Sequence, residues 1–287
     1  MKPLAGAVCL VTGASRGAGR GIALALGAEG ATVFVTGRSE KEGDAPLPGT
    51  VHATAAAVTA AGGTGIALVC DHADDQQVGD AIERVQREAG RLDILVNNAT
   101  ALHEQLIDPG PFWEKSPALA DILDVGLRSA YIASWHAAPL LLAAGGGLIV
   151  FTSSYGANCY MHGPAYGAQK AGTDKLARDM AIDFRPHGVA CVSIWMGMLR
   201  TERSRVAMER APEAYAGLWE IAETPELTGH LIARLYRDQQ RMDHSGRVWI
   251  GAELAAHYGI EDSDGRRAVS HREALGAPPE AHSAIVA

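Results

Sequence analysis

Tyr166 and Lys170, in the segment YGAQK, are the two side chains of this sequence whose types and spacing point most directly to chemistry. Residues four apart lie on one face of a helix, so the phenol and the ammonium can meet in one pocket. A free tyrosine has a pKa of about 10, and a neighbouring ammonium lowers that pKa by favouring the phenolate. The pair therefore predicts a proton-transfer site with Tyr166 as general acid or base. The spacing alone arises by chance in many helices, so its weight depends on the rest of the chain.

A glycine-rich segment near the N-terminus, TGASRGAG at residues 12–19, supplies that context. It follows the apolar run 7–11, which is typical of a buried strand, and precedes a helical pattern over 20–26. Glycines let the backbone approach a phosphate closely, and the free N–H groups of a helix N-terminus favour an anion. A strand, a glycine turn and a helix in this order predict a dinucleotide-binding unit. The alternative is an ordinary loop.

Short apolar runs alternate with helical patterns along the 287 residues of the chain. This alternation predicts an α/β fold: a single domain with a doubly wound parallel sheet of about seven strands (Rossmann-type), with a ligand crevice at the carboxyl ends of the strands. We expect this domain to span residues 1–260, with substrate loops at about 200–227, and residues 261–287 to form an extension that is partly ordered or covers a neighbouring subunit. The strand-like runs are 8–11, 32–36, 65–70, 94–96, 148–151, 190–194 and 247–250.

Three motifs together resemble the short-chain dehydrogenase/reductase family, of the type built on a single domain. TGASRGAG matches the TGxxxGxG motif of that family, and Tyr166 with Lys170 matches its YxxxK motif. Asn97-Asn98-Ala99 also follows the fourth strand-like run as in the family, with Thr100 in place of the usual glycine. Among subgroups the chain looks most like the animal dehydrogenase/reductase member-one type, on the runs VTGASRGAGRGIAL, RLDILVNNA, DVGLRSAY and YGIEDSDGR.

The resemblance implies an oxidoreductase that moves a hydride between a nicotinamide and a carbonyl or secondary alcohol substrate. Its catalytic residues correspond to Ser153, Tyr166 and Lys170: Ser153 would hold the substrate carbonyl, and Lys170 would also bind the nicotinamide ribose. Ser154, one residue further on, is the alternative to Ser153. The chain departs from the family at two places, with Gly126 at the position of a proton-relay asparagine and Met196-Gly197 at that of a Pro-Gly pair.

The expected cofactor is NADP(H). An acid at the end of the second strand usually marks NAD, whereas this chain has Gly37-Arg38 there. Arg38 and Arg16 could grip a 2′-phosphate, unless both are simply solvated surface arginines. Asp71 is expected to cap the adenine amino group or, alternatively, to cap the following helix. The cofactor-binding positions implied by the resemblance are Gly13, Ser15, Arg16, Gly17, Gly19, Arg38, Asp71, Asn98, Ala99, Tyr166, Lys170, Gly197, Leu199 and Thr201.

The substrate pocket is expected to draw on residues 101–103 and 155–162 and on a segment of about 203–227. Tyr160, Met161, His162 and Trp219 in these segments favour an apolar pocket with one or two polar groups. Such a pocket would suit ketones, aldehydes, quinones, steroid-like rings or acyl groups equally well. The 11 histidines show no metal-binding spacing, so no metal is expected.

The composition of the chain limits its expected partners and cellular compartment. A net charge of −8 without any basic run argues against nucleic acid as a partner. No apolar run approaches the ~20 residues that cross a bilayer, and no signal peptide is evident. The four cysteines are scattered, which favours free thiols in a reducing compartment, and we expect a cytoplasmic protein. The family resemblance implies a homodimer or homotetramer.

Two other functions fit parts of the sequence. Gly126 and the missing proline favour a catalytically weak NADPH-binding sensor or scaffold, against which the full Ser153, Tyr166 and Lys170 set counts. A nucleotide-sugar epimerase or dehydratase shares the YxxxK spacing, but such relatives have a TGxxGxxG turn and a longer C-terminal domain.

Overall fold

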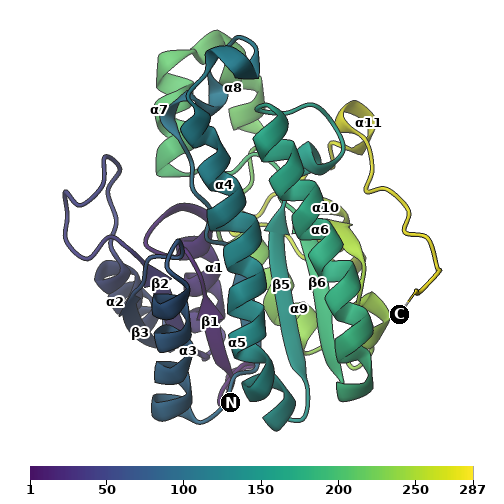
Figure 1. Cartoon of the computed structure of the whole chain (residues 1–287). Helices are drawn as coiled ribbons and strands as arrows, with labels where there is room; N and C mark the ends of the chain where they lie inside the picture. Colours follow the sequence, from purple (N-terminus) through teal and green to yellow (C-terminus); the bar gives the residue numbers. More distant parts are fainter. Residues whose placement is uncertain (287) are drawn as a thin grey trace.

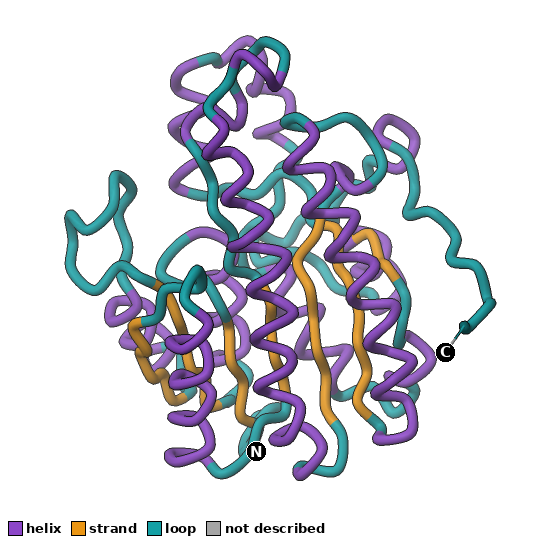
Figure 2. Tube along the Cα trace, in the orientation of Figure 1, coloured by secondary structure: helices purple, strands orange, loops and turns teal. Residues whose placement is uncertain are grey.

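All seven strand-like runs form strands of one parallel sheet (Figures 1 and 2). The computed structural model describes residues 1–286. The strands follow the order β3-β2-β1-β4-β5-β6-β7, so the chain starts in the middle, builds one half, and then crosses over to build the other. In folds with this strand order, the reversal beside β1 is where a ligand crevice forms at the carboxyl ends of the strands. Their bounds are β1 Val8–Val11, β2 Thr32–Gly37, β3 Thr64–Val69, β4 Ile94–Asn97, β5 Gly147–Ser153, β6 Val189–Trp195 and β7 Val248–Ile250.

Helices cover both faces of the sheet, because the side chains of each strand alternate between two apolar layers. Val8 and Leu10 of β1 enter one layer, whereas Cys9 and Val11 enter the other. The first layer is closed by α3 (Asp75–Ala89), α5 (Ser129–Ala143) and α6 (Pro164–Phe184). The second is closed by α1 (Gly17–Ala28), α2 (Val51–Ala60), α9 (Leu227–Tyr236) and α10 (Gly251–Tyr258). The predicted doubly wound, single-domain α/β fold is confirmed.

Local sequence signals set the ends of the helices that carry the site. Pro164 begins α6, where its fixed φ suits the first helical turn and its missing N–H costs nothing. Asp74 caps α3 by accepting hydrogen bonds from two backbone amides, and Gly90 ends that helix with a φ of 70°. Tyr166 and Lys170 therefore lie on a long helix, α6, that packs against β5 and β6.

Shorter elements gather beyond the carboxyl ends of the strands (Figure 1). Between β4 and α5 the chain forms three 3₁₀ turns, the single turn α4 (Asp121–Leu123) and a kinked segment, η4 (Asp124–Arg128). After β6 it forms α7 (Glu202–Arg210) and α8 (Pro212–Glu220). The segment expected as substrate loops at about 200–227 is therefore largely helical. The three 3₁₀ turns are η1 Glu104–Ile107, η2 Phe112–Glu114 and η3 Pro117–Ala120.

The C-terminal segment lies against its own chain. The phenol of Tyr155 accepts a hydrogen bond from the backbone of His271 (2.9 Å), just before the single turn α11 (Arg272–Leu275). Asn158 donates to the carbonyl of Ala277 (3.0 Å). This segment therefore covers the loop that follows β5, and the proposed domain boundary at residue 260 stays a prediction. None of the helices in residues 1–286 is both long and apolar enough to cross a bilayer.

Candidate active site

The glycine turn after β1 has a backbone that other residues could hardly adopt. Gly13 and Gly17 have φ values of 64° and 57°, in the left-handed region that favours glycine. A Cβ on Gly13 would lie 2.6 Å from the Cα of Ala99, and a Cβ on Gly19 would lie 2.4 Å from the carbonyl oxygen of Gly13. The turn is thus packed directly against the residues that follow β4, and it leaves the N-terminus of α1 facing the crevice.

Asn98 and Ala99 hold this turn in shape. The Thr12 hydroxyl accepts hydrogen bonds from the backbone amides of Asn98 (2.9 Å) and Ala99 (3.0 Å). The Asn98 side chain donates in turn to the carbonyls of Thr12 (2.9 Å) and Gly13 (3.1 Å). The Asn98 side-chain carbonyl oxygen also accepts a long hydrogen bond from Thr152 (3.5 Å). These two residues therefore hold the glycine turn in place against the ends of β4 and β5.

A carboxylate from a distant part of the chain occupies the phosphate cradle. The backbone N–H of Gly17, the first residue of α1, donates to Oε2 of Glu202 at 3.1 Å. A helix N-terminus stabilises negative charge, so the amide that binds this carboxylate could also bind a phosphate of a dinucleotide. The cradle therefore fits an anionic cofactor. Glu202 was not among the predicted residues, and its only sequence signal is the capping box of Thr201 and Ser204 that begins α7.

The two arginines at the expected 2′-phosphate site differ in their surroundings. The Arg38 guanidinium is mostly exposed just beyond β2 and lies 3.8 Å from the carboxylate of Asp71. The Arg16 guanidinium donates to Ser39 Oγ (2.8 Å) and to the carbonyls of Pro48 (2.9 Å) and Gly49 (2.7 Å). Arg16 thus anchors the loop after β2, and Arg38 is the more exposed cation, with a long ion pair to Asp71.

Asp71 and Ser15 lie at the same end of the crevice. Asp71 accepts a hydrogen bond from the amide of Ala73 (3.0 Å) and is half-buried after β3. The cap of α3 is Asp74, so the alternative role of Asp71 as that cap is wrong. Ser15 is buried in the glycine turn, and its carbonyl accepts a hydrogen bond from Thr54 (3.4 Å).

Tyr166 makes its hydrogen bond to Ser154. The two hydroxyl oxygens are 2.8 Å apart, in a part-buried position beyond the end of β5. Burial raises the pKa of Tyr166, and the hydrogen bond from Ser154 opposes part of that rise. Two hydroxyls converging in this way can contact one oxygen atom of a third molecule.

The structure corrects the expectation for Ser153. Its side chain is fully buried, and its hydroxyl donates to the backbone carbonyl of Lys170 (3.3 Å). Successive side chains of a strand point in opposite directions, and Ser153 is the last residue of β5, so it faces the interior beneath α6. Ser154 is the first residue after the strand and reaches the phenol. The serine beside Tyr166 is therefore the alternative one, twelve residues before the tyrosine.

Lys170 lies beneath Tyr166 on the same helix face. Its ammonium is 5.5 Å from the centre of the Tyr166 ring and donates to the carbonyl of Thr152 (3.2 Å). Burial lowers the pKa of Lys170 to about 8, with Asp174 acting in the opposite direction. Lys170 was expected to lower the pKa of the phenol, but in the protein alone burial raises that pKa and only the hydrogen bond with Ser154 opposes the rise.

The turn after β6 is held by a buried acid that was not predicted. The amide of Gly197 donates to the carboxylate of Glu223 (3.3 Å). The backbone of Glu223 also donates to the Met198 carbonyl (2.8 Å) and accepts from the Arg200 amide (2.9 Å). Burial raises the pKa of Glu223 to about 7. Glu223 therefore fixes the segment that contains Gly197, Leu199 and Thr201, where the family has a proline.

Gly126 keeps a helix kink without any side chain. Its φ of 144° is strained for any other residue, and its carbonyl accepts a hydrogen bond from Gln169 (3.0 Å). A Cβ at this position would lie 3.2 Å from Thr100 Oγ1 and from the Gln169 side chain. Glycine at this position therefore preserves the backbone kink before α5.

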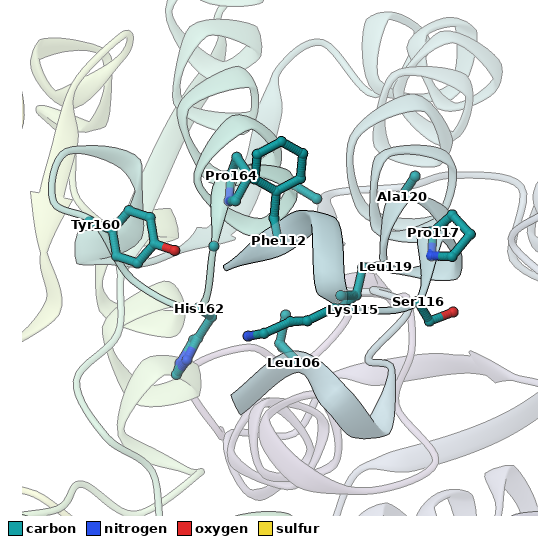
Figure 3. A pocket seen from close by; sticks show the side chains of 12 residues that line it. Leu106, Phe112, Lys115, Ser116, Pro117, Leu119, Ala120, Tyr160, His162 and Pro164 are labelled. Carbon is teal, nitrogen blue, oxygen red and sulfur yellow. The ribbon is translucent and has the colours of Figure 1, made fainter. Parts of the chain in front are cut away.

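A cavity of about 130 Å³ opens beside the N-terminus of α6 (Figure 3). Two of its lining residues, Tyr160 and His162, were predicted, whereas residues 101–103 and 203–227 do not line it. Among residues 1–286, no cluster of three or more His, Cys, Asp or Glu side chains could hold a metal ion. The lining residues are Leu106, Phe112, Lys115, Ser116, Pro117, Leu119, Ala120, Tyr160, His162, Gly163, Pro164 and Ala165.

The sheet order, the glycine cradle at its crevice and the tyrosine–lysine pair define a Rossmann-type oxidoreductase domain. Residues 7–211 match the family model described as short chain dehydrogenase. The chain belongs to the short-chain dehydrogenase/reductase family, whose members bind nicotinamide cofactors and act on small molecules. The family predicted from the three motifs is thereby confirmed.

Individual relatives support the subgroup. The chain is 41% identical to "Dehydrogenase/reductase SDR family member 1" of Homo sapiens over 275 residues, covering 92% of this chain and 85% of that protein. A crystal structure described as a dehydrogenase from Xanthomonas campestris matches with a TM-score of 0.76 and 27% identity, over 92% of this chain and 94% of the other. A metagenomic short-chain oxidoreductase in complex with NADP matches with a TM-score of 0.68 and 28% identity, over 86% and 97% of the two chains.

Proposed function

We propose that this protein is an NADP(H)-dependent oxidoreductase acting on a carbonyl or secondary alcohol substrate, with Tyr166 as its general acid–base group. The observation that carries the proposal is the 2.8 Å contact between the hydroxyls of Tyr166 and Ser154, with the Lys170 ammonium beneath the phenol ring. The bound nicotinamide would supply or accept the hydride, and the protein would supply placement and the proton.

Ser154, Tyr166 and Lys170 would have different roles at the substrate oxygen. Ser154 and Tyr166 would both hydrogen-bond that oxygen and hold it in one place. In reduction, the Tyr166 phenol would give its proton to the oxygen as the carbon accepts hydride, and the ammonium of Lys170 would stabilise the phenolate. Burial raises the pKa of Tyr166, so the phenol carries its proton in the free protein and has one to donate.

Preference for NADP(H) rests on the exposed cation at the end of β2. Arg38 follows Gly37, with no acid at that position, and its guanidinium is open to solvent. Such a cation can bind a 2′-phosphate with paired hydrogen bonds. Arg16 supports the neighbouring loop instead. The metagenomic relative in complex with NADP agrees with this preference.

A second candidate is a catalytically weak NADPH-binding sensor or scaffold. The Glu202 carboxylate in the phosphate cradle favours it, because a cofactor must displace this charge to bind. Gly126 also favours this candidate, because the family has a proton-relay asparagine at that position and glycine has no side chain to replace it. A sensor or scaffold would have no use for the paired hydroxyls of Ser154 and Tyr166. We therefore prefer the oxidoreductase.

We also propose a cytoplasmic homodimer or homotetramer. Tyr131 and Trp135 of α5 and Ile182 of α6 leave large apolar side chains exposed on the outer layer of helices. Burial of these side chains against a second copy would remove apolar surface from water.

The test is to follow the oxidation of NADPH and NADH by the purified protein across a panel of aldehydes, ketones and quinones. We expect turnover with NADPH, and a loss of at least about 100-fold in Tyr166→Phe, which removes a general acid. NADPH binding, measured by nicotinamide fluorescence, should persist in that variant. Turnover that survives in Tyr166→Phe would contradict the proposed role, and NADPH binding without any turnover would favour the sensor or scaffold.

A further inference from the structure

The cavity at the N-terminus of α6 lies one side chain away from the proposed catalytic phenol. Tyr166 is the third residue of α6, and the ring of His162 packs edge-on against the Tyr166 ring with centroids 5.0 Å apart. His162 also lines the cavity (Figure 3). A molecule in the cavity would therefore reach the phenol past His162.

Most of the lining is apolar and open to solvent. Leu106, Phe112, Pro117 and Leu119 provide it from the segment after β4, and Tyr160 provides it from the loop before α6. The side chains of Phe112 and Tyr160 are 57% and 81% exposed. Large aromatic surfaces grouped in this way gain free energy when an apolar ligand covers them.

Lys115 brings a positive charge into this apolar setting. Its side chain extends across the cavity with the ammonium turned toward His162 (Figure 3). No carboxylate among residues 1–286 lies within 4.0 Å of that ammonium. The carboxylate of the adjacent Glu114 lies near Gly110, at 3.9 Å from the position of a Cβ on that glycine.

The second titratable group of the cavity stays neutral. Burial lowers the pKa of His162, and the charge on Lys115 lowers it further. Lys115 is therefore the one full charge among the lining residues at neutral pH, on a chain whose net charge is −8. An unpaired ammonium beside an apolar surface is complementary to a molecule with an apolar body and an anionic end.

We propose that this cavity selects oxo-carboxylates, that is, carbonyl compounds with an apolar body and a carboxylate that pairs with Lys115. The inference rests on the proposed oxidoreductase function, because it names the substrate class of the same site. Lys115 would act on binding and leave the proton transfer at Tyr166 unaffected.

The experiment compares oxo-carboxylates with their methyl esters as matched pairs in the NADPH assay. We expect the wild type to prefer each acid over its ester by about fivefold or more in kcat/KM at low salt, with the difference residing in KM. Lys115→Gln should bring this ratio close to one, and Lys115→Arg should preserve it. The control is Lys175→Gln on the outside of α6, whose ammonium pairs with Asp179; it should leave the ratio unchanged.

Calorimetric titration separates failure of this inference from failure of the proposed function. The same pairs are titrated into wild-type protein with NADP⁺, which cannot reduce them. If the acids bind more tightly than the esters and Lys115→Gln removes the difference, the inference about Lys115 stands. It stands even if no turnover is seen and the proposed oxidoreductase function fails. If esters bind and react as well as acids while turnover still needs Tyr166, the inference is overturned and the function stands.

Discussion

The hydroxyl of Ser154 meets Tyr166, whereas the adjacent hydroxyl of Ser153 is turned into the interior. Ser154→Ala should therefore lower kcat/KM by about 100-fold, because it removes a group that would hold the substrate oxygen. Ser153→Ala should keep most of the activity and lower the free energy of unfolding by about 1 kcal/mol, the usual cost of one buried hydrogen bond. Steady-state kinetics and urea unfolding of both variants measure these effects. A larger loss of activity in Ser153→Ala would refute the assignment.

Glu223 makes stability depend on pH near neutrality. Its pKa rises from 4.5 to about 7 on folding, so the native state binds the proton more tightly than the unfolded state. Stability from this group is fully present below about pH 4.5 and is lost as the pH rises through about 7, by up to roughly 3 kcal/mol. Glu223→Gln should match the wild type at about pH 4 and exceed it in stability at about pH 8.

Urea unfolding of Glu223→Gln and wild type at the two pH values tests this prediction, since other titrating groups cancel in the difference. The glutamine can still accept the hydrogen bond from Gly197. A stability difference that does not change with pH would show that Glu223 is not a buried acid in solution.

At the scale of elements, the N-terminus of α7 is folded onto the N-terminus of α1. Thr201 caps α7, and the next residue, Glu202, places its carboxylate on the Gly17 amide. The pyrophosphate of a bound dinucleotide would need the same amide. Cofactor binding should therefore require the start of α7 to withdraw from the glycine turn.

Removing this charge should strengthen cofactor binding. Glu202→Gln is expected to lower the Kd for NADPH by about fivefold, since a neutral amide competes less well for a helix N-terminus than a carboxylate. Fluorescence titration measures the Kd, with Glu213→Gln at the exposed start of α8 as the matched control. Weaker binding in Glu202→Gln would mean that Glu202 assists the cofactor and does not compete with it.

The elements were predictable to different degrees. Buried parallel strands are continuous apolar runs, so all seven could be located from the sequence. The glycine turn and the YxxxK helix were equally clear, because backbone conformation and helical spacing depend on local residues. The choice between Ser153 and Ser154 depends on the residue at which β5 ends, and no local pattern fixes that point. Lys115, Glu202 and Glu223 act through contacts between segments far apart in the sequence.

At the scale of the whole molecule, burial determines the pKa values of Tyr166 and Lys170 more than their spacing on the helix does. The phenol and the ammonium of the YxxxK pair are both desolvated, so burial raises the pKa of Tyr166 and lowers that of Lys170 to about 8. The sequence shows the pair but not the depth at which α6 holds it. A bound cofactor and substrate would change this balance, because they add charge and exclude more water.

The N-terminus lies far from the candidate active site, whereas the C-terminal segment lies close to it. The N-terminus lies at the end of the sheet opposite α7 and α8 (Figure 1). The C-terminal segment, by contrast, passes over Tyr155, which directly follows Ser154, and is held to α6 where Arg178 donates to the carbonyl of Pro279. An affinity tag for purification is therefore better placed at the N-terminus, because the C-terminal segment contacts Tyr155, the residue next to the proposed catalytic serine.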